Sequence, residues 1–189
     1  MKTSENLIFE EEFFSRIREK EVWDKLSEGN DLDWNMQLIK KHADKWNWKL
    51  LSGNHNINWT ESMLAEFKDR ICWNELSDSI RCCRHYNLNY GHSPFLKIPV
   101  LEKYENLLNW ERISDSYILT SSEIIERFAH RLDWSLVIRN LDIEWTFDLF
   151  HKFKKYMTSI DAETLLSSHL WNCLIEHDKK IIMAKILID

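Results

Sequence analysis

One segment of the chain gathers residues whose side chains could bind a ligand or do chemistry. It covers residues 83–95, and it holds one of the three glycines and one of the two prolines. Its candidate binding residues supply hydrogen-bond donors, imidazole and phenol rings: Arg84, His85, Tyr86, Tyr90 and His92. An irregular loop on a rigid scaffold is a common place for binding groups. The alternative is an elaborated corner that binds nothing.

The same region raises the question of zinc, because soft ligands occur close together: Cys72, Cys82, Cys83, His85 and His92. Structural zinc sites use pairs of ligands at short, regular spacing, such as two cysteines separated by two to four residues, and no such pair is present. Cys72 and Cys82 also occupy apolar positions of the repeat described below. We therefore predict no metal, and free, buried thiols.

The sequence lacks the usual signatures of catalysis. The histidines outside residues 83–95 stand at scattered single positions, and none pairs with a serine or cysteine in the manner of a nucleophile and its base. Neither the P-loop, nor the dinucleotide glycine motif, nor the zinc-protease helix motif occurs. We expect no enzyme and no cofactor. A hydrolase using His85 or His92 ranks last among the hypotheses.

Two short basic runs suggest a second kind of function. The net charge is −6, which disfavours binding to nucleic acid chiefly through phosphates. The runs nevertheless provide candidate RNA-binding residues: Lys40, Lys41, Lys152, Lys154 and Lys155. Spacing on an amphipathic helix makes a solvated face the simpler interpretation. RNA binding, with stacking by Tyr86 and Tyr90, therefore stays the alternative.

The elements that would position these residues follow from a repeat of about 25 residues. Apolar residues recur at offsets of 0, 4, 5, 8 and 12 from each start, as in Trp59, Met63, Leu64, Phe67 and Ile71. The starts are positions 9, 34, 59, 96, 120, 145 and 170, with one insertion of about 12 residues. The offsets trace one face of an α-helix, so each run predicts a long helix.

A second column follows each of the first five starts, 14 residues on: Trp23, Trp48, Trp73, Trp110 and Trp134. Each of these tryptophans predicts a second, shorter helix, so each repeat is predicted to be an αα-hairpin. We expect the tryptophans to fill the seam between neighbouring hairpins. Asp33, Asn58 and Thr120 are the expected N-caps of three of the first helices.

These patterns predict an all-α solenoid of about six to seven αα-hairpin repeats, one interrupted by a loop. We expect a single domain over residues 1–189, with the irregular insertion at about 83–95 and atypical capping repeats at 1–32 and 159–189. No apolar run is long enough for a signal peptide or a membrane span, so we expect a cytoplasmic protein without membrane partners.

Two stretches carry a resemblance to known repeats: DWNMQLIKKHADKWNWKLLSGNHNI and NWTESMLAEFKDRICWNELSDSI. They resemble Trp-rich helical repeats of uncharacterised proteins from Bacteroidota, their phages and some large viruses. The resemblance covers most of the chain and implies a helical-repeat fold, but that group has no catalytic residues to carry over. A small, acidic, motif-poor protein also looks like mobile-element inhibitors, including anti-CRISPR proteins.

A long repeat surface, an interrupting loop and the lack of catalytic motifs together favour one function. We expect a non-enzymatic protein-binding module, and on the profile just described an inhibitor of a larger host or defence protein such as a CRISPR nuclease. The oligomeric state is left open by the sequence.

Overall fold

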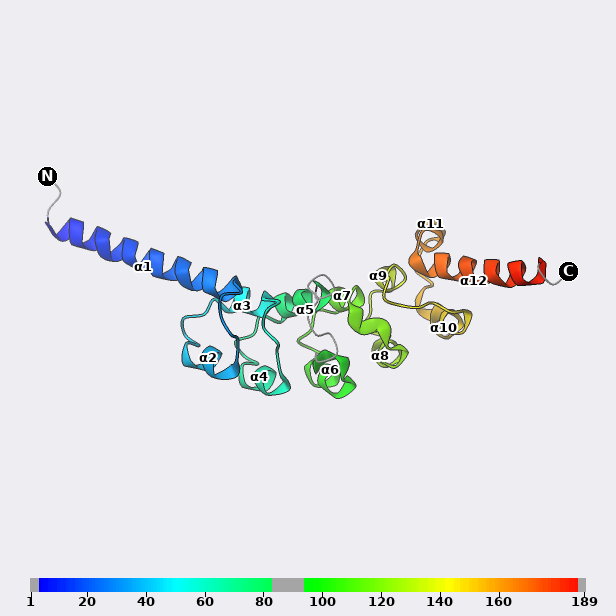
Figure 1. Ribbon diagram of the computed structural model, residues 1–189, viewed down its shortest axis with the longest axis horizontal. Coiled ribbons are helices and arrows are strands. Elements are labelled where there is room, and N and C mark those ends of the chain that lie inside the picture. Colours follow the sequence, from blue (N-terminus) through cyan, green and yellow to red (C-terminus); the bar gives the residue numbers. More distant parts are fainter. Residues whose placement is uncertain (1–3, 83–93, 187–189) are drawn as a thin grey trace. The chain divides into compact units, whose positions relative to one another are not determined.

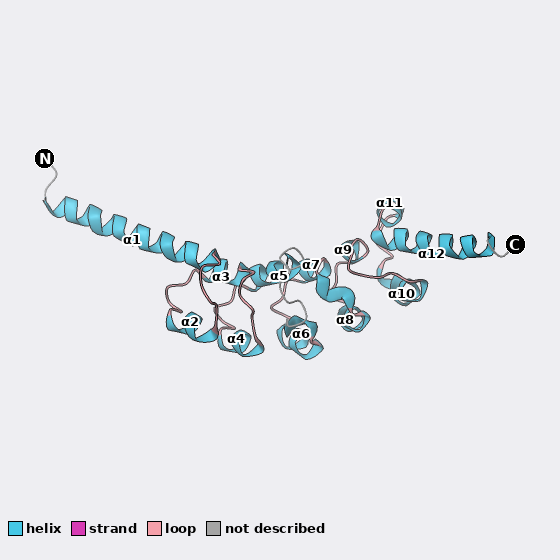
Figure 2. Cartoon of the chain, in the orientation of Figure 1, coloured by secondary structure: helices cyan, strands magenta, loops and turns pink. Residues whose placement is uncertain are grey.

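The computed structural model describes residues 4–82 and 94–186; within these ranges its regular secondary structure is helical, joined by turns and loops, with no β-strand (Figure 2). This confirms the all-α class. The contacts divide the chain into two compact units, Met1–Ser79 and Ile80–Asp189, and each is described by itself. The expected single domain over 1–189 stays a prediction. No helix within the described ranges is long and apolar enough to cross a membrane.

The first unit is built from short helices that follow one long helix (Figure 1). Its described helices are α1 (Ser4–Glu28), α2 (Met36–Lys41), α3 (Trp48–Gly53), α4 (Glu61–Glu66) and α5 (Trp73–Cys82), the last running across the division. In the figure α2 lies beside α4, and an ion pair between Lys40 and Glu66 joins these two helices. Helix α1 packs against α3.

The second unit alternates short α-helices with 3₁₀ turns and ends in a long helix. Its described elements are η3 (Pro94–Leu96), α6 (Ile98–Tyr104), α7 (Trp110–Ser114), η4 (Tyr117–Thr120), α8 (Ser122–Phe128), α9 (Trp134–Val137), α10 (Phe147–Phe153), η5 (Lys154–Tyr156), α11 (Ala162–Leu166) and α12 (His169–Ile186). Leucine, isoleucine and aromatic side chains from these elements form a buried core, with Leu101, Ile113 and Val137 fully covered.

The second helix of each repeat begins where the sequence predicts. Trp48, Trp73, Trp110 and Trp134 are the first residues of α3, α5, α7 and α9. Each of these indole N–H groups donates to the carbonyl five residues earlier, at 2.8–2.9 Å. Three of these helices are capped by the residue just before the tryptophan, Asn47, Asn109 or Asp133. The tryptophan therefore fixes both the start of the helix and the turn before it.

The first helix of each repeat is shorter than predicted, and its cap lies elsewhere. Helices α2, α4 and α8 are six or seven residues long, although the offsets from 0 to 12 predicted a continuous helix. The predicted caps Asp33, Asn58 and Thr120 are wrong, because the caps are Asn35, Thr60 and Ser121. Each side chain accepts a backbone N–H three residues on, which places the preceding residue outside the helix.

Helix α1 departs from the predicted hairpin, because it continues without a turn over Ser4–Glu28. The residue before its tryptophan, Trp23, is Val22, whereas the equivalent positions in α3, α7 and α9 hold a capping Asn or Asp. Valine has no side-chain acceptor for a new first turn, so nothing stops the helix there. Cys72 before Trp73 is not a capping Asn or Asp either, yet a turn precedes α5, so the missing cap favours the continuous α1 without determining it alone.

Buried serines connect neighbouring repeats within each unit. Ser27 donates to the Trp23 carbonyl at 2.7 Å and accepts the Asn47 N–H at 3.1 Å. Ser114 repeats the arrangement in the second unit, with its acceptor at 2.6 Å and the Asp133 N–H at 2.8 Å. A small hydroxyl can satisfy both backbone groups at once inside the core. This explains why serine follows four of the five second-column tryptophans by four residues in the sequence.

His55 in the first unit gives an expected pH dependence. Burial lowers the pKa of His55 below its ordinary value of 6.5, and the Ser79 backbone and the Asp78 charge oppose this only in part. The unfolded chain then binds a proton more readily, so stability should fall as the pH drops below about 6.5. We expect the urea midpoint of the chain to decrease on acidification, and to decrease less in His55→Gln. An identical pH dependence in both proteins would contradict this assignment.

Candidate interaction surfaces

Among the described side chains of helix α1, three exposed apolar residues lie on one side, which we call the α1 apolar face: Phe13, Phe14 and Ile17. Their side chains are 51%, 57% and 39% exposed, and the two phenylalanine rings meet edge to face at 5.8 Å. On a helix these positions lie on a side different from that of Glu19 and Trp23, which contact the next repeat. Such a cluster of large exposed apolar side chains is a candidate interaction site.

The repeat shows why this face is unusual. The residues that occupy the offsets of Phe13 and Phe14 in α4 and α8 are Met63 and Leu64, and Ile124 and Ile125, all of them buried. At the offset of Ile17, an aromatic ring packs on the second-column tryptophan of the preceding repeat. The four pairs have ring centroids 4.9–5.4 Å apart: His42 on Trp23, Phe67 on Trp48, Phe128 on Trp110 and Phe153 on Trp134.

A cationic pocket lies on another side of α1. Arg16, Glu19, Lys20, Trp23 and Lys45 line an open surface depression of about 310 Å³. The Lys45 ammonium bonds the Glu19 carboxylate at 2.8 Å and lies 5.3 Å from the centre of the Trp23 ring. That hydrogen bond holds the pKa of Glu19 below its usual range. Lys45 therefore serves the contact between repeats, and Arg16 and Lys20 leave the pocket positively charged.

Ion pairs between residues 25 or 26 positions apart join neighbouring repeats on the surface. They are Glu19–Lys45, Lys40–Glu66, Asp44–Arg70 and Lys49–Glu75 in the first unit, and Glu102–Arg127, Glu105–His130, Glu105–Arg131 and Glu126–Lys152 in the second. Exposed pairs of this kind contribute about 0–1 kcal/mol each to stability. Their regular spacing nevertheless explains much of the charge pattern along the chain.

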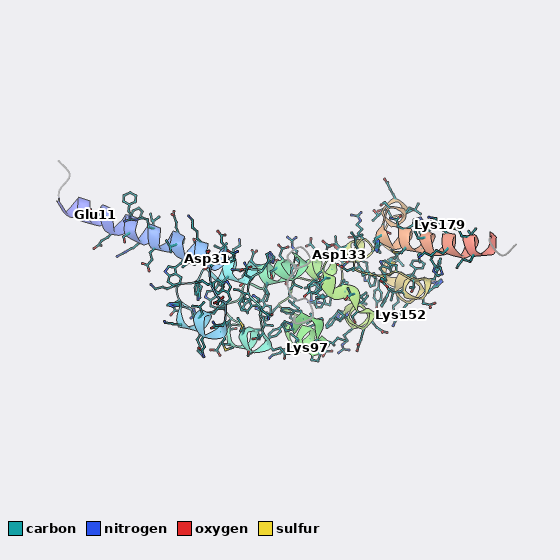
Figure 3. All side chains as sticks on the ribbon, viewed as in Figure 1. Glu11, Asp31, Lys97, Asp133, Lys152 and Lys179 are labelled. Atoms are coloured by element: carbon teal, nitrogen blue, oxygen red, sulfur yellow. The ribbon has the colours of Figure 1, made fainter. Side chains whose placement is uncertain are left out.

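The structure places the basic-run candidates in different environments. Lys40 and Lys152, the latter labelled on α10 in Figure 3, form two of these ion pairs. Lys155 lies 4.9 Å from the centre of the Tyr156 ring. Lys41 and Lys154 are exposed. Lys40 and Lys41 belong to the first unit, whereas Lys152, Lys154 and Lys155 belong to the second.

The candidate binding residues Arg84, His85, Tyr86, Tyr90 and His92 lie outside the described residues, as does Cys83. Cys72 and Cys173 are free thiols, half-buried. Within the part of the chain that the structure describes, no group of three His, Cys, Asp or Glu side chains could hold a metal ion.

A second exposed apolar surface lies on α12, and we call it the α12 apolar face: Ile175, Ile182 and Met183. These side chains are 47%, 56% and 51% exposed. Ile175 and Ile182 are seven residues apart, which puts them on one side of the helix, and Lys179 lies between them. The sequence places Phe13, Phe14, Ile17, Ile175 and Ile182 at repeat offsets within the predicted capping repeats, and their spacing alone did not predict which of them are exposed.

Comparison with known proteins identifies no relative of this chain. No family model, curated protein or solved structure matches the chain. The function must therefore be argued from the surfaces themselves.

Proposed function

We propose that this chain is a non-enzymatic, protein-binding helical-repeat module, and that the α1 apolar face is a binding surface. One observation carries the proposal: Phe13, Phe14 and Ile17 are exposed, whereas the residues at the same offsets in α4 and α8 are buried. Covering such side chains contributes about 25 cal/mol per Å² of apolar surface removed from water. The partner is a protein, because a second apolar surface is what this face would pack against.

We further propose that the hairpins of each unit stack as a solenoid. The recurring contacts support this: tryptophan rings pack on the residue at offset 8 of the next repeat, serine hydroxyls bridge neighbouring backbones, and surface ion pairs recur every 25 or 26 residues. A repeat that contacts only its neighbours leaves unpaired faces on its terminal members.

The partner is proposed to be a larger host or defence protein such as a CRISPR nuclease, which the chain would inhibit in the cytoplasm. This rests on the small, acidic profile of the sequence and not on particular residues. RNA binding is less well supported, because Lys40 and Lys152 already pair with carboxylates of neighbouring repeats. Recovery of RNA is accordingly one outcome of the following test.

The test is capture from cells of the source with tagged protein, with and without nuclease. We expect to recover one stoichiometric protein, and its recovery should survive nuclease treatment. The double variant Phe13→Asp/Phe14→Asp should reduce the amount recovered at least about tenfold, since burying two carboxylates in an apolar interface costs well over 1.4 kcal/mol. The matched control is Glu11→Gln/Glu12→Gln, which changes two exposed neighbours on the same helix. Capture that is equal for both double variants, or enrichment of RNA alone, would contradict the proposal.

A further inference from the structure

We infer that the α1 apolar face of one molecule binds the α12 apolar face of a second copy of this chain, head to tail. The inference rests on the proposed function, because it takes the α1 apolar face to be a protein-binding surface. It adds the identity of the partner, a second copy of the chain. Three features of the two helices support it: their place in the repeat, their apolar residues and their charge.

The place in the repeat gives the direction of the contact. In four pairs of neighbouring repeats the residue at offset 8 packs against the end of the preceding repeat, on its second-column tryptophan. Ile17 holds offset 8 on α1, and its side chain is 39% exposed. It is therefore ready to pack on the last helix of another copy, as His42 packs on Trp23.

Helix α12 offers a surface of the right kind. Its exposed Ile182 and Met183 stand 12 and 13 residues after the last repeat start, directly before Ala184 at offset 14, the position that holds a tryptophan in five earlier repeats. Ile175 extends the apolar surface by two helical turns. The α1 apolar face and the α12 apolar face thus present large side chains at the positions through which neighbouring repeats meet within each unit.

Charge favours the same pairing. Helix α1 carries eight acidic and four basic residues, a net charge of −4. Helix α12 carries two acidic and three basic residues, a net charge of +1; its exposed Lys179 lies beside Ile175 and Ile182 and pairs with Glu176 of the same helix at 3.1 Å. Pairing α1 with a second α1 would bring like charges together, whereas pairing α1 with α12 brings opposite charges together. The contact is therefore heterologous, and it can continue from copy to copy.

The experiment measures the mass of the purified chain in solution by light scattering or sedimentation. We expect the average mass of the wild type to rise with concentration beyond that of a dimer. A head variant, Phe14→Asp/Ile17→Asp, and a tail variant, Ile175→Asp/Ile182→Asp, should each stay monomeric. All four positions are exposed, so both variants should keep the wild-type circular dichroism.

Mixing the two variants is the decisive step. The head variant keeps an intact α12 apolar face and the tail variant an intact α1 apolar face, so the equimolar mixture should form a dimer that neither variant forms alone. Lys179→Glu/Lys180→Glu should weaken that dimer about tenfold, and the exposed Lys154→Glu in the same unit should not. A monomeric wild type, a variant that still associates, or a mixture that stays monomeric would overturn the inference.

These outcomes are separable from failure of the proposed function. A chain that stays monomeric but still captures another protein through Phe13 and Phe14 would overturn head-to-tail pairing and leave the binding module intact. Self-association without capture of any other protein would support the head-to-tail pairing and contradict the proposal of a larger partner protein.

Discussion

Replacing Phe128 with alanine should destabilise the second unit by about 3–5 kcal/mol, because it removes a fully buried aromatic ring and leaves a cavity. The ring is 1% exposed and stacks on Trp110 with centroids 4.9 Å apart and an interplanar angle of 27°. It is also the contact that joins two successive repeats. Urea unfolding followed by tryptophan fluorescence measures the change directly.

The matched control is Phe14→Ala, the same substitution on the exposed α1 apolar face. It should change stability by less than about 1 kcal/mol, since the ring is 57% exposed and no cavity forms. A loss of similar size for Phe14→Ala would mean that this ring is part of the core and not available to a partner. A loss below about 1 kcal/mol for Phe128→Ala would contradict the packing between repeats.

The second large loss of stability is expected on replacing either of two asparagines, which occupy equivalent positions of the repeat, one in each unit. The Asn140 amide donates to the carbonyls of Ser114 and Ser116, at 3.4 and 2.9 Å, and accepts the Asp142 N–H at 2.9 Å. Asn54 makes the equivalent bonds to Ser27 and Gly29 of the preceding repeat, both at 2.9 Å. Both side chains are buried.

Alanine at either position leaves buried backbone groups without partners, each costing about 1–3 kcal/mol. We expect Asn140→Ala and Asn54→Ala each to lose about 3 kcal/mol of unfolding free energy in chemical denaturation. Asn58→Ala, at an exposed position, should stay within about 0.5 kcal/mol of the wild type. If Asn54→Ala and Asn58→Ala unfolded at the same urea concentration, the hydrogen bonds of Asn54 to the preceding repeat would contribute nothing to stability.

The sequence predicted those features of the fold that depend on one repeated residue. The tryptophans at 48, 73, 110 and 134 begin helices as expected, because a capping residue or a turn precedes each of them. The first helices were predicted too long, since the apolar residue at offset 12 returns to the core after a turn, as Trp46 and Ile71 do. Apolar spacing alone cannot distinguish a long helix from a helix followed by such a turn.

The interaction surfaces could not be predicted for a different reason. Phe13 and Phe14 have the same spacing as Met63 and Leu64, and only the neighbouring repeat determines which pair is buried. Likewise Lys40 belongs to a basic run in the sequence, but its partner Glu66 is 26 residues away. Burial and pairing between repeats are tertiary properties, so a single sequence gives them no separate signal.

The claim that the α1 apolar face binds protein is tested most directly by a photo-crosslinking amino acid at position 14, with a matched substitution at Glu12 on another side of α1. Irradiation in cells of the source should give protein cross-links from position 14, including cross-links to a second copy, and far fewer from position 12. Cross-links to RNA, or equal yields from the two positions, would contradict the account.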